Sequence, residues 1–386
     1  MIRSVWWIVG LGGLGYWLFI ARRVVGGLLR PRRLSAVTLR ERPIWPRVSV
    51  IVPARNEEAA LEGCLKSLLG QDYQQLEIVA LDDRSTDASG QVMDDLAAID
   101  PRLEVIHVKE LPAEWLGKSH ANFLGAAAAT GDWILFTDGD IIFSPQVLKL
   151  AIAHVEAEGL DHLSLFPGLV CHGPLEKAAI CTFGLILSAF LKVRDIRNPL
   201  KPKSFCGIGA FNLVRASAYR SMGGHERLRM EVADDVKLGK LMKMHGYTSD
   251  LLEAADLLSL RWQNGFLGVI GGLEKNGFAG SDFRTAKAFG GILALTAVVL
   301  LPLIGVILAP GLCRIPYAVW LMSQLALLGL GAAVQGSSPL LGLLFPVASL
   351  GIVYAILRSV VLALVRGGIY WRETFHSLKE LRRGVV

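Results

Sequence analysis

Charge is distributed so unevenly along this chain that it sets the class of protein. From Val5 to Ala21 the sequence has no charged residue, and from Phe289 to Val365 the only ones are Arg314 and Arg358. An α-helix needs roughly 20 mostly apolar residues to cross a bilayer. Both stretches are therefore predicted to form membrane-spanning helices, which excludes an ordinary cytosolic enzyme.

The first apolar stretch predicts an uncleaved N-terminal anchor at residues 1–21 and a basic juxtamembrane linker at residues 22–46. A signal peptide would carry positive charge before its apolar run and a cleavage site after it. Here the order is reversed, and positive flanks stay on the cytoplasmic side. We therefore expect a multi-pass protein of the cell (inner) membrane with a cytoplasmic central part. The arginines after the anchor are Arg22, Arg23, Arg30, Arg32, Arg33, Arg40, Arg42 and Arg47.

The formal net charge of +6 is compatible in principle with a nucleic-acid partner. However, these arginines gather beside a membrane span, where anionic lipid is the simpler partner. We therefore expect the membrane, and no nucleic acid, to be the partner.

The C-terminal apolar region, residues 288–365, is followed by a basic tail at residues 366–386 that includes Arg372. Turn residues divide the region into three predicted spans: Phe289–Ala309, Ile315–Val334 and Leu340–Val365. Together with the anchor, three spans put both chain ends on the outer side, whereas the basic tail favours the cytoplasm. One segment is re-entrant or interfacial, or the last one is a hairpin near Arg358, or the charge of the tail is overridden. The sequence leaves this open.

The central part, residues 47–287, has an ordinary soluble composition in which apolar runs alternate with helical patterns. Such alternation predicts an α/β domain with a parallel sheet and right-handed crossovers. Ligands of these sheets bind beyond the carboxyl ends of the strands. The predicted strands are Val48–Val52, Leu76–Leu81, Leu103–Val108 and Trp133–Phe136, and the predicted helices are Glu57–Leu69, Thr86–Ala98 and Ser119–Ala129.

Acidic residues stand at the ends of these strands. Glu57 follows the first strand, Asp83 ends the second, and Asp138 and Asp140 follow the fourth. Clustered carboxylates repel one another unless a cation offsets them, and Mg²⁺ takes one or two carboxylates together with phosphate oxygens. We therefore favour a divalent ion and a phosphorylated ligand at this edge over a set of solvated turns.

Three further features bear on this site. Lys118 precedes the Ala-rich helix, where the helix start and the ammonium suit a phosphate, although an exposed surface lysine is equally compatible. Asp234 and Asp235 open an Asp-Asp-x-x-Leu pattern, and a helix start there predicts a lowered carboxylate pKa. The apolar run Ala178–Leu191 is short for a span, so it is either a core helix or an interfacial helix that presents a lipid.

Short motifs follow one another in order across the central part. They are Val50–Glu58, Asp82–Asp87, Gly117-Lys118, Phe136–Asp140, Phe205–Gly207, Met222–Gly224, Asp234–Leu238 and His245–Tyr247. Their types and order resemble the inverting family 2 glycosyltransferases, which have the GT-A fold. One anchor before and several spans after them are similar to the membrane-bound branch acting on lipids, which includes hopanoid-associated and carotenoid glycosyltransferases. The resemblance implies a Rossmann-like GT-A domain with a mostly parallel sheet.

The resemblance also implies roles for individual residues. A nucleoside pocket, usually for uridine, would be lined by Pro53, Arg55, Glu57 and Asp83, with Lys118 near the diphosphate. Asp138-Gly139-Asp140 matches the family's D-x-D motif, in which Asp140 would be the stronger ligand of Mg²⁺ or Mn²⁺ and Asp138 the other. Asp235 falls on the catalytic base, and Asp234 on its neighbour.

One motif departs from the family pattern. Processive members carry Gln-x-x-Arg-Trp, but here Leu258–Trp262 keeps Arg261 and Trp262 and lacks the glutamine. This favours transfer of a single sugar, with Arg261 and Trp262 closing over the diphosphate or the acceptor.

The sequence thus predicts a metal-dependent membrane-bound hexosyltransferase that moves one sugar from a nucleotide-sugar, expected to be a UDP-sugar, to a lipid acceptor. A processive membrane polysaccharide synthase is the alternative. A nucleotidyltransferase or a sugar-binding membrane protein without turnover is a second class, and Asp235 counts against the latter. A transporter is disfavoured, because spans without buried charges offer no polar path.

Overall fold

We describe the chain from a computed structural model, which covers residues 2–29, 31–39, 44–191, 193–371 and 374–386. It divides into two compact units. The sheet unit comprises Pro31–Val170, Lys192–Trp262 and Glu380–Val386, and the helical unit comprises Met1–Arg30, Cys171–Leu191 and Gln263–Lys379. Among the basic residues named above, those outside the described residues are Arg30, Arg40, Arg42 and Arg372.

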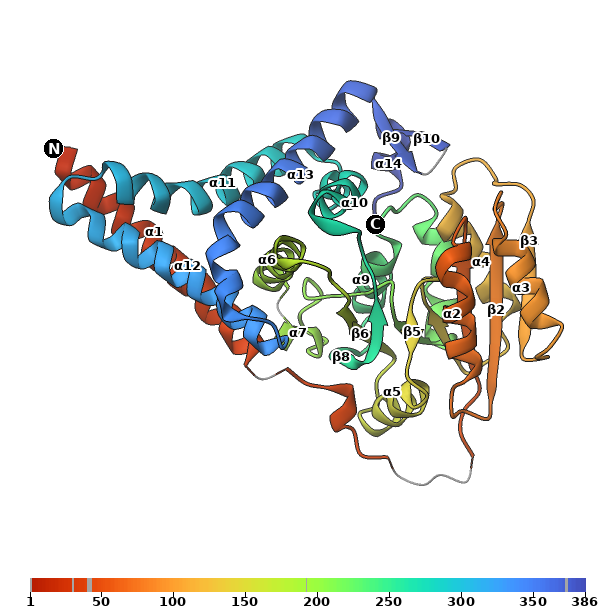
Figure 1. The fold of residues 1–386 in the computed structure, drawn as a ribbon. Coiled ribbons are helices and arrows are strands. Elements are labelled where there is room, and N and C mark those ends of the chain that lie inside the picture. The colour runs from red at the N-terminus through yellow and green to blue at the C-terminus, as the bar shows by residue number, and fades with distance from the viewer. Residues whose placement is uncertain (1, 30, 40–43, 192, 372–373) are drawn as a thin grey trace. The chain divides into compact units, whose positions relative to one another are not determined.

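The sheet unit is built on an eight-stranded mixed sheet in the order β3-β2-β1-β4-β7-β6-β8-β5 (Figure 1). Strands β3, β2, β1 and β4 are parallel, and β6 is parallel to β8, while β7 is antiparallel to both of its neighbours. The predicted mostly parallel α/β domain is confirmed. The strands are β1 Val48–Ala54, β2 Leu76–Asp83, β3 Leu103–Val108, β4 Trp133–Phe136, β5 Ile142–Phe143, β6 His162–Leu169, β7 Asn212–Arg215 and β8 Ser249–Leu260.

Helices cover both faces of this sheet, because successive side chains of a buried strand point to opposite faces. In β1, Val50 and Val52 join the core beneath α2 and α5, whereas Ile51 joins the core beneath α4 and α9. The elements of this unit are α2 Glu58–Leu69, α3 Ser89–Ala97, α4 Gly117–Ala128, α5 Val147–Ala157, α7 Val193–Ile196, α8 Ala216–Ser221 and α9 Asp234–Met244, with the short turns η1 Leu34–Ala36 and η2 Gly224–Leu228.

Several predicted boundaries differ from the observed ones by a few residues, and two of these differences have a clear physical reason. β1 continues through Pro53, which is tolerated because the pairing of β1 with β4 ends at Ile51 and leaves no hydrogen bond for Pro53 to break on that side. The helix predicted from Thr86 begins at Ser89 instead, because the Thr86 N–H donates to the Asn56 side-chain oxygen at 2.8 Å.

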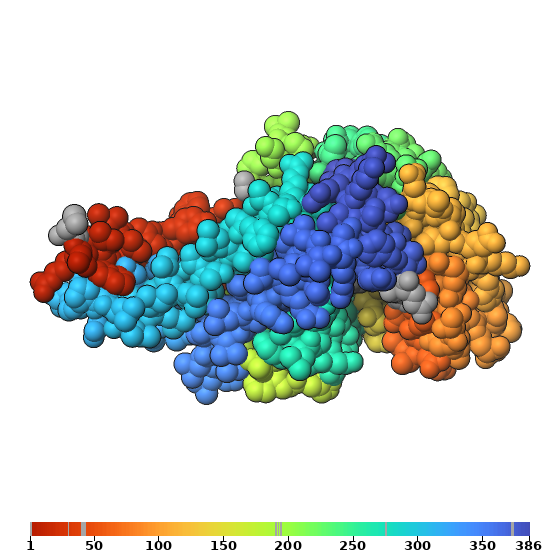
Figure 2. Space-filling view, turned by 90° about the horizontal axis from the view of Figure 1, so that it is seen from above, coloured from red at the N-terminus to blue at the C-terminus, as the bar shows by residue number. Residues whose placement is uncertain are grey.

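Among the described residues of the helical unit, four helices are long and apolar enough to cross a membrane: Ile2–Leu28, Thr285–Leu308, Gly311–Val334 and Pro339–Arg366. The first packs along the third, as the red and light-blue segments in Figure 2 show. Gly13 leaves room there for the ring of Trp320. The elements are α1 Ile2–Leu28, α6 Pro174–Phe190, α10 Gly265–Ala279, α11 Thr285–Leu308, η3 Gly311–Cys313, α12 Arg314–Val334, η4 Pro339–Leu344, α13 Phe345–Arg366, β9 Gly368–Trp371 and β10 Thr374–Ser377, and α14 Leu378–Arg383 runs from this unit into the sheet unit.

Candidate active site

The turn after β4 is fixed by a neighbouring loop. The Thr137 hydroxyl donates to the Ala210 carbonyl at 2.8 Å, and the Asp138 N–H donates to the Gly209 carbonyl at 3.0 Å. β4 is fully buried in the middle of the sheet. The direction in which Asp138 points is therefore set by the sheet and by the loop before β7.

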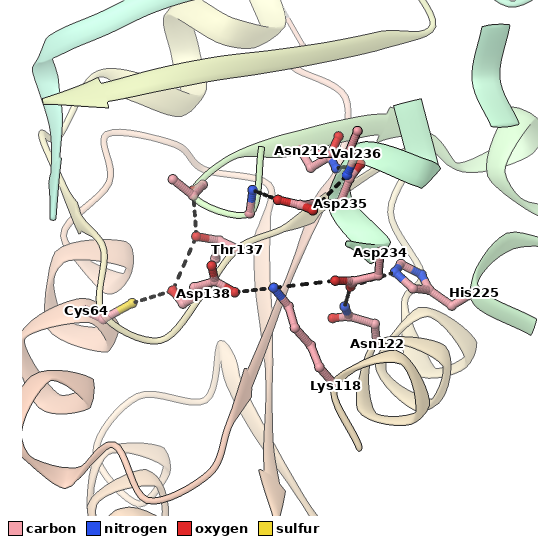
Figure 3. Close-up of polar contacts among 12 residues, drawn as sticks. Cys64, Lys118, Asn122, Thr137, Asp138, Asn212, His225, Asp234, Asp235 and Val236 are labelled. Atoms are coloured by element: carbon pink, nitrogen blue, oxygen red, sulfur yellow. Dashed lines mark hydrogen bonds and ion pairs between the residues drawn. The ribbon is translucent and has the colours of Figure 1, made fainter. Parts of the chain in front are cut away.

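Lys118 links this turn to the start of α9. Its ammonium lies 2.5 Å from Asp138 Oδ1 and 3.8 Å from Asp234 Oδ1 (Figure 3). Burial alone would lower the pKa of Lys118, but Asp138, Asp234 and Asp235 raise it far above its usual range. Lys118 is therefore a permanent positive charge among carboxylates that come from distant parts of the sequence.

Asp234, the first residue of α9, is buried and held by three partners. Its carboxylate accepts from the Asn122 amide at 3.1 Å, lies 3.6 Å from His225 Nε2, and faces Lys118. Burial would raise the pKa of Asp234, but Lys118 and the hydrogen bond from His225 outweigh it and lower the pKa. Asp234 thus stays ionised with its oxygens occupied by protein groups.

Asp235 has a different environment, although it is the next residue. Its Oδ2 accepts the Gly209 N–H and its Oδ1 accepts the Val236 N–H, both at 2.8 Å, and the residue is only half-buried. Burial and the neighbouring Asp234 raise the pKa of Asp235 to about 6. The predicted lowering of this pKa is wrong, because desolvation and a like charge exceed the effect of the helix N-terminus.

The carboxylate of Asp140, the second acid of the turn, is destabilised by its surroundings. Burial, Asp138 and Glu57 raise the pKa of Asp140 to about 6. Among the described residues, no group of three or more His, Cys, Asp or Glu side chains is close enough to hold a metal ion. Two carboxylates nevertheless suit Mg²⁺ or Mn²⁺, which take their remaining oxygens from a phosphorylated ligand. The donor set of Asp138 and Asp140 therefore fits a divalent ion that arrives together with a diphosphate.

Asp83 lies at the end of β2, where its carboxylate is already engaged. Arg84 donates to both Asp83 oxygens, at 2.8 and 3.2 Å. A Cβ placed on Gly117 would lie 2.2 Å from Asp83 Oδ2, so α4 can begin this close to β2 only with a glycine. The structure therefore gives Asp83 a role in orienting Arg84 and the start of α4.

Pro53 lies near the end of β1, and the loop after β1, which carries Arg55 and Glu57, is hydrogen-bonded to the loop after β2 and to the start of α3. The Asn56 N–H donates to the Ser85 hydroxyl at 3.1 Å, and the Glu57 N–H donates to the Ser89 hydroxyl at 2.9 Å. Neighbouring parallel strands bring the two loops together. These hydrogen bonds were not predicted, because neither motif by itself indicates that the other lies beside it.

Arg261 and Trp262 follow the end of β8. The antiparallel register places Ser259 opposite Ile142 of β5. Two positions beyond this pair, just after β8 and just before β5, are Arg261 and Asp140. The Trp262 ring is half-buried against the larger core of the sheet. Tertiary pairing thus brings the Arg-Trp element toward the D-x-D turn, whereas Lys118, Asp138, Asp234 and Asp235 form the connected centre of the site.

Three functional residues were missed in the sequence. Asn122 and His225 hold Asp234, and Gly209 holds both Asp138 and Asp235. His225 is itself oriented by Tyr219, whose hydroxyl lies 2.9 Å from its Nδ1. The only available signal was that His225 directly follows the Met222–Gly224 motif.

Replacing Gly209 by alanine is expected to reduce turnover by about 10²-fold, the loss associated with misplacing reacting groups by about 1 Å. The added Cβ would lie 2.5 Å from Asp138 Oδ2 and 3.3 Å from Asp235 Oδ2, so both carboxylates must move. Steady-state kinetics and thermal unfolding should be measured beside Gly271→Ala, whose new Cβ meets nothing within 4 Å. Equal turnover in both variants would contradict this role.

Comparisons with known proteins show what this chain is similar to. Residues 49–223 match the sequence profile described as Glycosyl transferase family 2, a segment that includes the D-x-D turn and ends before Asp234. The 4,4'-diaponeurosporenoate glycosyltransferase of Staphylococcus haemolyticus is 27% identical over 66% of this chain and 67% of its own length. The uncharacterized glycosyltransferase EpsJ of Bacillus subtilis is 37% identical over 30% of this chain and 32% of its own. A mannosyltransferase from Pyrobaculum calidifontis, solved with GDP-Man and Mn²⁺, has a TM-score of 0.54 at 18% identity, covering 97% of this chain and 100% of that one. The last likeness establishes the shared fold.

Proposed function

Because this chain contains a glycosyl transferase family 2 domain, we propose that it is a membrane-bound inverting enzyme transferring one sugar from a nucleotide-sugar, expected to be a UDP-sugar, to a lipid acceptor. The observation that carries the proposal is the contrast between Asp234 and Asp235. Asp234 is saturated by Lys118, Asn122 and His225, whereas the Asp235 carboxylate accepts two backbone N–H groups and is partly open to solvent. A base must reach its substrate, so Asp235 fits that role.

The raised pKa also fits the role. A carboxylate with a pKa of about 6 is ionised at neutral pH and accepts a proton more readily than an ordinary aspartate. Asp235 takes the proton of the acceptor hydroxyl as that oxygen bonds to the anomeric carbon. The bond from that carbon to the diphosphate oxygen breaks at the same time, and one displacement inverts the centre.

Negative charge develops on the leaving diphosphate. Lys118 is a permanently charged ammonium beside Asp138, and it can stabilise that charge when the diphosphate lies at the turn. Asp138 and Asp140 would hold a Mg²⁺ or Mn²⁺ ion, which when bound neutralises the same charge. Arg84, fixed by Asp83, supports the nucleoside side of the site.

Two observations support a lipid acceptor. The relative from Staphylococcus haemolyticus is named for 4,4'-diaponeurosporenoate, a carotenoid carboxylate, and the described residues of this chain include four helices that could cross a membrane. The missing glutamine before Arg261-Trp262 favours one transfer over a processive polymer. Processive polysaccharide synthesis is the alternative outcome of the test below.

The test is to incubate the purified full-length protein in detergent with UDP-, GDP- and dTDP-sugars and to measure nucleotide release with and without host lipid extract. We expect release with UDP-sugars that depends on the extract and yields a glycolipid with one added sugar. Extension to long glycan chains would establish the processive alternative. Release that is unaffected by lipid would contradict the proposed acceptor class.

A reporter fused after Ser281 is expected to behave as cytoplasmic. The arginines after α1 hold the chain that follows on that side, which is where nucleotide-sugars are made. A reporter fused after Ala309, beyond α11, is the matched control and should behave as external. If the first reporter is external, both the orientation and the nucleotide donor must be given up.

A further inference from the structure

The last residues of the chain pack against the body that carries the carboxylates. Residues Glu380–Val386 belong to the sheet unit. The Val386 N–H donates to Glu231 at 2.5 Å, and the Lys237 ammonium donates to the Val386 carbonyl at 3.2 Å. The Val386 side chain also packs against the core beneath α4 and α9. The tail therefore lies on the same side of any membrane as the sheet unit.

This placement limits how often the chain can cross. The chain leaves the sheet unit at Val170 and returns at Lys192, and it leaves again at Trp262 and returns at Glu380. A chain that leaves an aqueous unit and returns to it crosses the bilayer an even number of times. The first excursion contains α6 as its single described helix, so α6 does not cross. The second contains α10, which at 15 residues is too short to span a bilayer, and α11, α12 and α13, which therefore cannot all cross.

The packing of α12 along α1 shows the direction in which these two helices run relative to each other. Tyr317 donates to the Trp6 carbonyl at 2.9 Å, and Trp17 donates to the Ser323 hydroxyl at 2.8 Å. Contacts therefore advance in the same direction along both helices, which makes them parallel. Because α1 leads directly into the sheet unit, α12 also ends on that side once α11 has crossed in the opposite direction. A crossing by α13 would then leave the tail on the wrong side.

The neighbours and charges of α13 fit this conclusion. α13 packs against α6, the helix that does not cross, and against α10. Arg358, in the second half of α13, pairs with Glu274 of α10 at 3.1 Å, and Arg366 pairs with the same carboxylate at 3.1 Å. An arginine at the centre of a span is costly to insert, whereas an interfacial helix keeps its charges at headgroup level.

One side of α13 is apolar and has no cover from the rest of the described chain. Its exposed side chains recur at steps of three and four, the spacing of one helical face. They are Val347, Leu350, Tyr354, Leu357, Val361, Leu364 and Val365.

We propose that α13 lies in the membrane interface on the side of the sheet unit, with this apolar face in lipid, and does not cross the bilayer. The inference rests on the proposed membrane insertion of α1, α11 and α12 and not on the sugar donor or acceptor. It resolves the conflict between three C-terminal spans and a basic tail. A hairpin near Arg358 is excluded, because α13 is one continuous helix from Phe345 to Arg366.

The test is the accessibility of single introduced cysteines to an impermeant maleimide, in spheroplasts and in inverted vesicles of cells making the full chain. Leu312→Cys reads the turn between α11 and α12, Ser337→Cys the turn between α12 and α13, and Arg383→Cys the tail. Lys109→Cys marks the sheet unit, and the wild type sets the baseline from the native thiols. We expect positions 337, 383 and 109 to label from one side and position 312 from the other.

Labelling of positions 337 and 383 from opposite sides would overturn the proposal, since α13 would then cross. Labelling of position 312 from the same side as the rest would overturn it as well. Gln335→Cys reads the same turn if the Ser337 variant does not accumulate. The experiment compares the labelling of positions with one another and does not require enzyme activity. A protein that shows the expected labelling pattern but transfers no sugar would therefore contradict only the proposed function.

Discussion

Replacing Asp235 by asparagine is expected to lower turnover by about 10²–10⁴-fold, the usual loss when a general base is removed. The amide keeps the shape of the side chain and can still accept the Gly209 N–H, which donates to Asp235 at 2.8 Å. Donor affinity should therefore change little. Turnover and the donor dissociation constant should be measured beside Asp234→Asn, which should lose less turnover because Asp234 only orients the site.

The two variants distinguish the expected result from two other outcomes. If Asp234→Asn is inactive and Asp235→Asn is active, the roles are reversed. If both keep near-normal turnover, the pair only caps α9 and the catalytic assignment is wrong.

In the wild type, the raised pKa of Asp235 means that protonation begins to remove the base as the pH falls through about 6. A bound cation would lower that point, so kcat should fall at or below pH 6, and Asp235→Asn should lack this limb.

Replacing Asp140 by asparagine, or removing divalent ions with EDTA, is expected to abolish transfer while the protein stays folded. Burial, Asp138 and Glu57 destabilise the Asp140 carboxylate, so a cation that binds with the diphosphate relieves this repulsion. Nucleotide binding should be measured by calorimetry with and without Mn²⁺. In wild type Mn²⁺ should tighten binding, and in Asp140→Asn that effect should disappear.

The control for this experiment is Asp95→Asn, which removes one carboxylate from α3 that accepts from Gln91 in an exposed contact. It should keep both turnover and the Mn²⁺ effect. The thermal unfolding midpoint of Asp140→Asn should not fall, because the variant removes a half-buried carboxylate that Asp138 and Glu57 repel. Full activity in EDTA would show that the D-x-D turn works without a metal.

Much of the fold could be predicted because its signals are local. The strands Leu103–Val108 and Trp133–Phe136 were predicted with their observed ends, since buried strands are short apolar runs with clear boundaries. The helix after β1 differs by one residue at its start. The antiparallel β7 was not predicted, because strand pairing depends on contacts between segments far apart in the chain.

The site was predictable in its residue types but not in its electrostatics. A carboxylate at a strand end is visible in the sequence, so Asp138 and Asp140 could be named. Lys118 lies more than a hundred positions from Asp234, and His225 and Gly209 belong to other segments again. Their meeting, and the opposite pKa shifts of Asp234 and Asp235, follow from burial and distance, which no motif contains.

The sequence alone determined the four long apolar helices found in the described residues and the α/β domain between the first of them and the other three, because hydrophobic length and alternation are properties of consecutive residues. It also located the acidic turn at the end of β4. Only the tertiary structure decided that Asp235 is the carboxylate left open to a substrate, because Lys118, Asn122 and His225 occupy Asp234. Likewise, the proposed even number of crossings rests on the contact of Val386 with Glu231, since a hydropathy pattern counts apolar segments but cannot show where the chain returns.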